Sequence, residues 1–370
     1  MKTNKYSELA AIPEIYREDM ENPVIINHNF DFSITPETIE AELEQLIEQQ
    51  TEASENKGLF TIKSINEWIE QAKNRPIPKM LFGQLWFENE LCILFSDTNL
   101  GKSCLAVQIG NSISKGKAVN GFAFESAQQP VLYFDFELSD KQFEARYSDN
   151  FTNHYRFDNN FSRVEINPNS EPTEMNFQTY LNESLERTIS DTGAKVVIID
   201  NLTYLRSGTE TAKDALPLMK HLKTLKTKYN LSILVLAHTP KRDLSKPITR
   251  NDLQGSKMLI NFCDSSFAIG ESFTDRHLRY IKQIKQRNCK LLYDADNVGV
   301  CEITKSSNFL QFEFINFGTE KEHLKELNDK DKEQRKQEAA ELKSQNIPNR
   351  EIARRLGVSE GAIRKWFKST

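Results

Sequence analysis

Short runs of apolar residues, each followed by a segment with helical spacing, make up the middle of the chain. The first run, LCILF at residues 91–95, precedes a helical face formed by Leu105, Ala106, Ile109 and Ile113. Three more segments contain an apolar run that is followed by a polar side chain, and they are VLYFDFE, AKVVIIDNLTYL and LSILVLAHTPK. Apolar runs of this length are typical of strands buried on both faces of a parallel sheet. The alternation therefore predicts an α/β fold with a mostly parallel sheet flanked by helices.

Beyond residue 264 the pattern changes to alternating apolar and polar residues with short polar turns. Five such segments follow one another, and they are SSFAIGE, LRYIKQIKQRN, CKLLYDA, VGVCEIT and FLQFEF. They predict antiparallel hairpins that complete the sheet near Gly318. Upstream, residues 59–90 are apolar and aromatic, with Pro76, Pro78 and Gly83 as breakers, which is typical of the start of a folded domain. We therefore predict one α/β domain over residues 59–318.

Two polar segments flank this domain. Residues 1–58 are acidic, rich in Glu and Gln and poor in large apolar residues, so a flexible tether is expected. Within it, helical spacing of Ile39, Leu43 and Leu46 leaves open a small amphipathic helix that docks on a neighbouring subunit. Residues 319–346 are almost wholly charged with both signs mixed, which predicts a solvated connecting helix.

The segment SDTNLGKS between the first strand and its helix fits a phosphate-binding loop with one departure. Backbone N–H groups of such a loop and of the helix N-terminus converge on phosphate oxygens. Lys102 adds a charge for the outer phosphates and the Ser103 hydroxyl can ligate magnesium, so ATP and Mg²⁺ are the expected ligands. The departure is a serine in place of the first glycine. The predicted nucleotide-binding residues are Ser96, Asp97, Thr98, Asn99, Leu100, Gly101, Lys102, Ser103 and Cys104.

Polar side chains end the next three predicted strands. Glu137 ends the second strand, Asp200 ends the third and His238 ends the fourth. Ligands of parallel sheets bind at the edge where the carboxyl ends of the strands meet. A carboxylate delivered there can hold magnesium through water, which suits Asp200. His238 can sense the terminal phosphate or orient water, and a purely structural hydrogen bond at the strand end is the alternative.

In this order, the phosphate loop, Glu137, VVIID, LAHTPK and KQIKQRN resemble the RecA-fold motor ATPases. Within them the chain is most similar to hexameric helicases, both the plasmid replication helicases of the RepA type and the replicative helicases of the DnaB type. The resemblance covers roughly residues 76–314 and implies a RecA-like ATPase domain. It implies that Glu137 is the general base, Asp200 the magnesium-water carboxylate and His238 the polar sensor.

The same resemblance implies a catalytic role for two basic residues, Lys285 and Arg287, which would reach from one subunit into the nucleotide site of the next. Residues two apart on a strand share a face, so both side chains can project together. An arginine supplied in this way stabilises transition-state charge. The alternative is that both are solvated strand residues that point outward.

Overall charge and cysteine content limit the function classes. The chain has 48 basic and 53 acidic residues, a net charge of −5, so it is not a polycation that binds nucleic acid indiscriminately. Its five cysteines are scattered and lack metal-ligand spacing, as expected for buried thiols of a reducing compartment. No apolar run is long enough to span a membrane, and we expect a cytoplasmic protein without a membrane partner.

The last segment, residues 347–370, combines an apolar pattern with a local excess of positive charge. Its apolar positions and the turn at Gly357 resemble the helix-turn-helix of resolvase and repressor modules. Six basic residues stand against two acidic ones here. A helical hairpin for protein contact is the alternative. The predicted DNA-binding residues are Arg350, Arg354, Arg355, Ser359, Arg364, Lys365 and Lys368.

Together these features predict an ATP-dependent motor that acts on DNA as a homo-oligomeric ring or filament, with a hexamer favoured. A helicase or a replication or mobilisation ATPase would be recruited to duplex DNA by the helix-turn-helix, with single-stranded DNA in the channel of the ring. Two alternatives remain open. One is an ATP-gated DNA-binding regulator or adaptor without unwinding activity, and the other is an ATPase that acts on protein.

Overall fold

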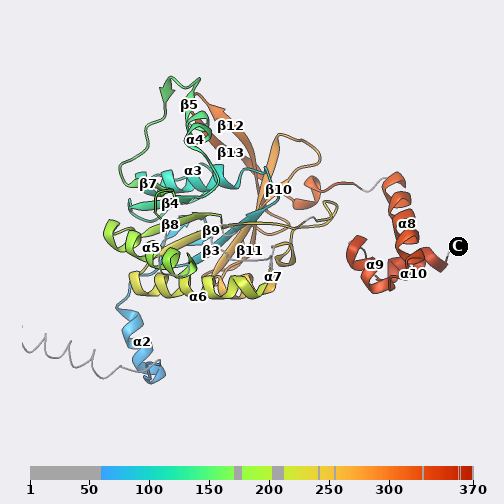
Figure 1. Ribbon diagram of the computed structural model, residues 1–370, viewed down its shortest axis with the longest axis horizontal. Coiled ribbons are helices and arrows are strands. Elements are labelled where there is room, and N and C mark those ends of the chain that lie inside the picture. Colours follow the sequence, from blue (N-terminus) through green and yellow to red (C-terminus); the bar gives the residue numbers. More distant parts are fainter. Residues whose placement is uncertain are drawn as a thin grey trace, which may run out of the picture. The chain divides into compact units, whose positions relative to one another are not determined.

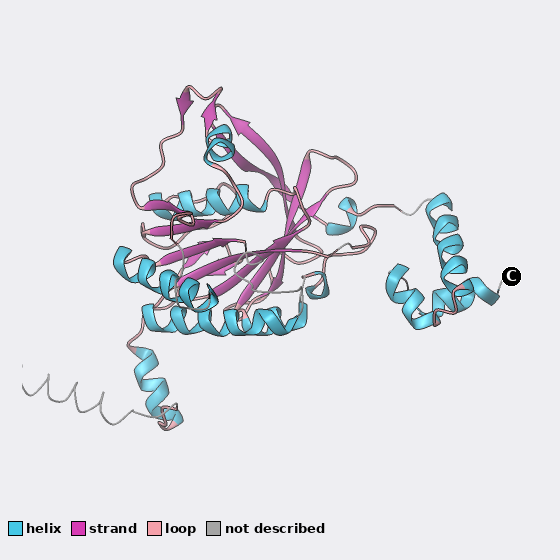
Figure 2. Cartoon of the chain, in the orientation of Figure 1, coloured by secondary structure: helices cyan, strands magenta, loops and turns pink. Residues whose placement is uncertain are grey.

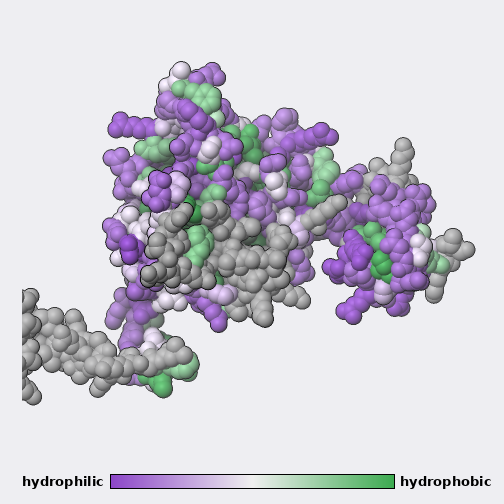
Figure 3. Space-filling view, viewed as in Figure 1, coloured by the Kyte–Doolittle hydropathy of each residue, from purple (hydrophilic) through white to green (hydrophobic). Residues whose placement is uncertain are grey.

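The computed structural model describes residues 60–170, 177–201, 212–240, 242–253, 256–326, 329–356, 358 and 360–368. The predicted acidic segment 1–58 lies outside the described residues. The chain divides into two units, residues 1–76 and 77–370. In the first unit, α2 (Ile65–Lys73) begins with a capping box in which Ser64 Oγ accepts from Glu67 N at 3.2 Å. Apolar side chains gather at the surface of this unit, among them Phe60 and Ile62 (Figure 3).

The second unit contains a nine-stranded sheet with the order β13-β12-β11-β10-β3-β9-β8-β4-β7. Its parallel strands are β3 (Leu91–Ser96), β4 (Val131–Asp135), β7 (Phe161–Val164), β8 (Val196–Asp200), β9 (Ser232–His238) and β10 (Ser265–Glu271). Its antiparallel strands are β11 (Leu278–Lys285), β12 (Val298–Ser306) and β13 (Phe309–Gly318). Two small hairpins pair β1 (Met80–Phe82) with β2 (Trp86–Phe87), and β5 (Ser148–Asp149) with β6 (Asn153–His154).

Helices cover both faces of the sheet (Figures 1 and 2). They are α3 (Lys102–Lys115), α4 (Asp140–Arg146), α5 (Phe177–Thr192), α6 (Ala212–Tyr229) and α7 (Ser256–Phe262), with a short 3₁₀ turn η4 (Arg250–Asp252). One apolar core lies between the sheet and α3, and the other lies between the sheet and α5, α6 and α7. Leu94 packs in the first core and its neighbours Ile93 and Phe95 pack in the second, because successive strand side chains point to opposite faces. This architecture confirms the predicted RecA-like α/β fold with terminal antiparallel strands.

The predicted strand CKLLYDA is wrong, because residues 289–295 form a turn between β11 and β12. The Gln283 side chain takes the place of a partner strand. Its Oε1 accepts from Leu292 N at 2.8 Å and from Tyr293 N at 3.3 Å, and Gln283 N donates to Tyr293 O at 2.7 Å. Tyr293 is buried beside Phe122, with ring centroids 5.8 Å apart. Of the apolar residues that suggested a strand, Tyr293 therefore anchors a turn, whereas Leu291 and Leu292 are exposed.

The core continues beyond Gly318 into a 3₁₀ turn, η5 (Glu320–His323). The Glu320 side chain is buried and accepts hydrogen bonds from Lys282, from Ile248 N at 2.7 Å and from Tyr280 OH at 3.3 Å. A buried carboxylate needs such partners, so this turn belongs to the folded core rather than to a solvated connection.

The C-terminal segment forms three helices, α8 (Asp329–Ser344), α9 (Asn349–Leu356) and α10 (Glu360–Lys368). They enclose a small apolar core of Ala339, Ile352, Ala353 and Ile363. α8 was expected to be a solvated connector, but Ala339 is fully buried against the other two helices. The last turns of α8 thus form the first helix of a three-helix module, because two short helices alone could not bury these side chains. In the part of the chain that the structure describes, no helix is long and apolar enough to cross a membrane.

Candidate nucleotide-binding site

Four parallel strands bring the predicted nucleotide residues to one edge of the sheet. In the register of β3 and β9, Ser96 lies opposite His238, and in the register of β4 and β8, Asp135 lies opposite Asp200. Glu137 follows β4 by two residues, and its backbone N–H donates to Asp135 Oδ1 at 3.1 Å. The parallel register, rather than the sequence separation, therefore places these side chains at the carboxyl edge.

The phosphate loop connects β3 to α3 through two residues with left-handed backbone. Asn99 has a φ of 63° and Gly101 has a φ of 90°. A Cβ on Gly101 would lie 2.7 Å from Ile303 Cδ1 and 2.9 Å from Phe312 Cε2, so glycine is required both for backbone angle and for space. Ser96 is not among the described residues with positive φ. The serine at the first loop position is thus compatible with this backbone.

The Lys102 ammonium bends back over the loop. Its Nζ donates to Ser96 O at 3.1 Å and to Asp97 O at 3.0 Å, and it lies 3.2 Å from His238 Nδ1. Burial lowers the pKa of Lys102, while the carboxylates of Asp200 and Glu137 act in the opposite direction. The loop thus keeps a buried cation in place, and arriving phosphate oxygens would be strong acceptors for it.

Asp200 is almost fully buried at the tip of β8, and Tyr133 OH donates to its Oδ2 at 2.7 Å. Its Oδ1 has no hydrogen-bond partner among the described residues. Burial raises the pKa of Asp200 to about 6, and hydrogen bonds from Ser103 and Tyr133 oppose this rise. A bound divalent cation would offset the cost of burying the carboxylate charge. Asp200 and Ser103 therefore fit a magnesium site, because Mg²⁺ takes one or two protein oxygens beside water and phosphate.

Glu137, His238 and Asn201 form a polar group beside the lysine. His238 Nε2 lies 3.6 Å from Glu137 Oε1, and Asn201 Nδ2 contacts both Glu137 Oε1 and, at 3.2 Å, His238 Nε2. The hydrogen bond with His238 lowers the pKa of Glu137, as do the charge of Lys102 and the Asn201 amide, against the effect of partial burial. Glu137 is therefore ionised at neutral pH, as a residue that accepts a proton or orients water must be.

The phosphate loop, the start of α3, Glu137 and His238 line a cavity of about 300 Å³. Sequence reasoning predicted eight of its lining residues, and the three that it missed are Arg146, Ile303 and Leu310. Arg146 ends α4, while Ile303 and Leu310 belong to the β12–β13 hairpin. No sequence signal marks them, because their place at the cavity depends on how distant elements pack. Asn201 could have been found, since it directly follows the VVIID strand.

Lys285 and Arg287 lie at the other edge of the sheet. Lys285 pairs with Ser266 at the start of β10, whereas the phosphate loop follows the end of β3, which is parallel to β10. Lys285 Nζ donates to Ile260 O at 2.5 Å and to Cys263 O at 2.6 Å, so it does not simply point into solvent. Within one chain these two residues are thus not brought to the Lys102 site, and their role in a neighbouring subunit stays a prediction.

The predicted DNA-binding residues lie on α9 and α10 of the C-terminal module, where Arg350, Arg354, Arg355, Arg364 and Lys365 are exposed. Three of them are in ion pairs within the module. Glu351 pairs with Arg354 and Arg355, and Glu360 pairs with Arg364. Hydrogen bonds from the two arginines lower the pKa of Glu351 to about 2. Ser359 and the Lys368 side chain lie outside the described residues.

Comparisons with known proteins agree with this division. Residues 61–243 match the AAA domain and residues 330–369 match the homeodomain-like domain. No curated protein matches the sequence significantly. Among solved structures, the chain is similar to a KaiC-like protein, PH0186, from Pyrococcus horikoshii OT3, at 13% identity and a TM-score of 0.43, over 62% of this chain and 91% of that one. The chain therefore combines a RecA-like α/β fold, most of which matches the AAA domain, with a C-terminal helical module that matches the homeodomain-like domain.

Proposed function

We propose that this protein hydrolyses ATP to act on DNA as an oligomeric motor, with a hexameric helicase or a replication or mobilisation ATPase as the favoured form. The observation that carries the proposal is the convergence of Lys102, Glu137 and His238 around one cavity, with Asp200 buried at the same carboxyl edge of the sheet. The second support is the homeodomain-like module, since folds of this kind place a helix in the major groove of DNA.

The roles of the site residues follow from their positions. The backbone N–H groups of the loop and the N-terminus of α3 bind phosphate oxygens, and Lys102 adds its charge to them. Glu137 accepts a proton from the attacking water or orients it, while Asn201 and His238 hold the Glu137 carboxylate in place. A bound Mg²⁺, held by Ser103 and Asp200, would supply charge neutralisation on the phosphates.

DNA contact is assigned to the exposed basic residues of α9 and α10. Their ion pairs with Glu351 and Glu360 are exposed and span three or four residues, so each contributes little to stability. Phosphate oxygens can therefore replace these carboxylates at little cost. One small module has limited affinity, and several modules in one oligomer would raise it through effective concentration.

The alternative is an ATP-gated regulator or adaptor that binds DNA without unwinding it. It is favoured by the homeodomain-like module, which fits duplex DNA rather than a single strand. Unwinding of a labelled forked duplex, measured with ATP and with a non-hydrolysable analogue, separates the two functions. ATP-dependent strand release supports the motor. Hydrolysis that DNA stimulates without strand release supports the regulator, and hydrolysis that DNA leaves unchanged contradicts both.

A further inference from the structure

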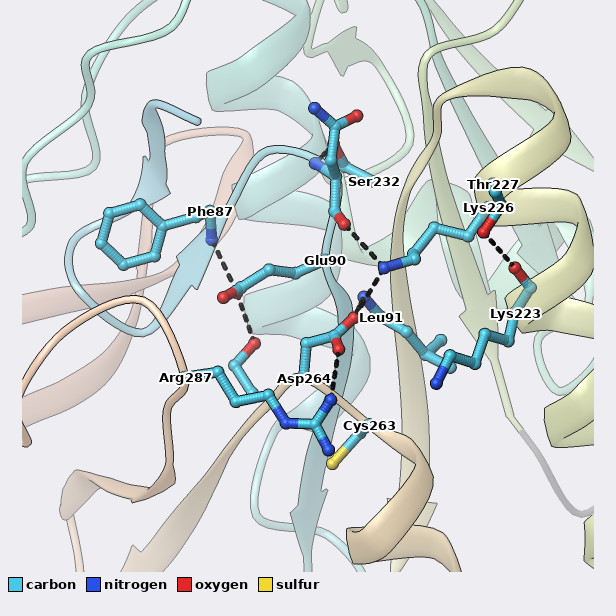
Figure 4. A network of polar contacts seen from close by, with 12 residues as sticks. Phe87, Glu90, Leu91, Lys223, Lys226, Thr227, Ser232, Cys263, Asp264 and Arg287 are labelled. Atoms are coloured by element: carbon cyan, nitrogen blue, oxygen red, sulfur yellow. Dashed lines mark hydrogen bonds and ion pairs between the residues drawn. The ribbon is translucent and has the colours of Figure 1, made fainter. Parts of the chain in front are cut away.

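Asp264, the residue before β10, joins three elements at the amino edge of the sheet (Figure 4). Its Oδ2 accepts from Leu91 N at 3.0 Å and from Lys226 Nζ at 2.9 Å, and its Oδ1 accepts from Arg287 Nη1 at 3.1 Å. Burial would raise the pKa of Asp264, but these hydrogen bonds and the two nearby cations lower it instead. Asp264 is therefore an ionised carboxylate fixed to the first residue of the central strand.

The Arg287 guanidinium is held by contacts that do not use all of its N–H donors. Its Nη1 contacts Asp264 and its Nη2 donates to Asn261 O at 3.3 Å, while half of the side chain stays exposed. A guanidinium has five N–H donors in a rigid fork, so a second anion can bind while these contacts remain. Lys226 also shares the single charge of Asp264, and the cluster therefore keeps an excess of positive charge.

Lys285 is in a different situation. It is half-buried, and its ammonium donates to two carbonyl groups at the end of α7, Ile260 O and Cys263 O. A cation at the last carbonyls of a helix is a stabilising arrangement. Of the two basic residues in KQIKQRN, Lys285 thus supports the local fold, whereas Arg287 is the one presented to a partner.

We propose that Asp264 is a positioning residue that orients the Arg287 guanidinium for the nucleotide site of a neighbouring subunit. The inference rests on the proposed function as an oligomeric ATPase and on the expectation that Arg287 reaches the nucleotide site of the next subunit. A free arginine side chain loses rotamer entropy when it binds. The Asp264 contact removes part of that loss beforehand, and the backbone bond to Leu91 ties the arginine to the strand that carries the phosphate loop.

The test replaces Asp264 by asparagine in the full-length protein. Asp264→Asn preserves size and loses the charge that holds Arg287, so kcat for ATP should fall about ten- to a hundredfold while KM stays within about twofold. The matched control is Lys226→Gln, which removes the other cation on Asp264. It should lower the melting temperature and leave kcat unchanged within about twofold.

Mixed assemblies separate positioning from a structural role. Asp264→Asn subunits keep an intact Lys102 and Lys102→Ala subunits keep an intact Arg287, so mixing them should raise hydrolysis above that of either variant alone. A mixture of Arg287→Ala and Lys102→Ala subunits serves as the positive control. If that mixture recovers hydrolysis but verified mixed assemblies with Asp264→Asn do not, the positioning role is refuted and the proposed function stands. If Asp264→Asn does not assemble, Asp264→Glu, which displaces the carboxylate by one methylene, takes its place in the same mixture. Wild-type protein without ATPase activity would refute the proposed function itself, and this inference with it.

Discussion

The Glu137→Gln substitution tests the proposed general base with little disturbance of the fold. Glu137 follows β4 at the edge of the cavity, is partly exposed and contacts Asn201 and His238. Glutamine has the same size and keeps a carbonyl oxygen that can accept from the Asn201 amide. We therefore expect a loss of unfolding free energy within about 0.5 kcal/mol, as for substitutions away from buried networks.

The effect on hydrolysis should be large because the proton acceptor is removed. General base catalysis contributes about 10²–10⁴ in rate, which corresponds to roughly 3–5 kcal/mol of transition-state stabilisation. ATP binding should persist, since Lys102 and the loop N–H groups carry the ground-state phosphate contacts. The assay measures kcat by phosphate release, and Kd from titration with a fluorescent ATP analogue.

A matched control distinguishes the role of Glu137 from a general loss of charge near α4. Glu144 lies on α4, pairs with Lys141 and His154, and does not line the cavity. Glu144→Gln should therefore hydrolyse ATP at the wild-type rate. Wild-type hydrolysis by Glu137→Gln would refute the assignment, and Asp200 would become the next candidate for the base.

Four further outcomes are expected. Lys102→Ala should abolish nucleotide binding in the same titration, because the charge for the outer phosphates is lost. Glu320→Ala should lower the unfolding free energy in urea by about 3–5 kcal/mol, because it leaves the buried Lys282 ammonium unpaired. Burial raises the pKa of Glu90 above its ordinary 4.5. The contribution of Glu90 to stability is thus fully present below pH 4.5 and is lost as the pH rises through its folded-state pKa. In parallel melts at a series of pH values, Glu90→Gln should therefore gain stability relative to wild type over that rise in pH. Removal of residues 329–370 should abolish duplex binding in fluorescence anisotropy across a salt series and preserve basal ATPase activity, and unchanged binding would make the module a protein contact.

Much of the fold could be predicted from local pattern alone. The apolar runs at β3, β4, β8 and β9 are continuous because these strands are buried on both faces, and this local signal needs no knowledge of the partner strands. The same reasoning failed at residues 289–295, where Tyr293 is buried as the anchor of a turn that the Gln283 side chain holds, and Leu291 and Leu292 are exposed. It also failed for α8, because the buried residue Ala339 lies among charged residues in the sequence.

Part of the candidate site could likewise be predicted from local sequence, and the rest could not. The sequence by itself determined the phosphate loop and the polar residues at the strand ends, since their chemistry lies in short contiguous motifs. Only the tertiary structure decided that Ile303 and Leu310 line the cavity, and that Arg287 is held by Asp264 at the opposite edge of the sheet. Asp264 and Arg287 are 23 positions apart, and Ile303 is about 200 positions from Gly101, beside which it packs, so no local pattern encodes these contacts. They depend on strand order and register, which are fixed only when both faces of the sheet are packed.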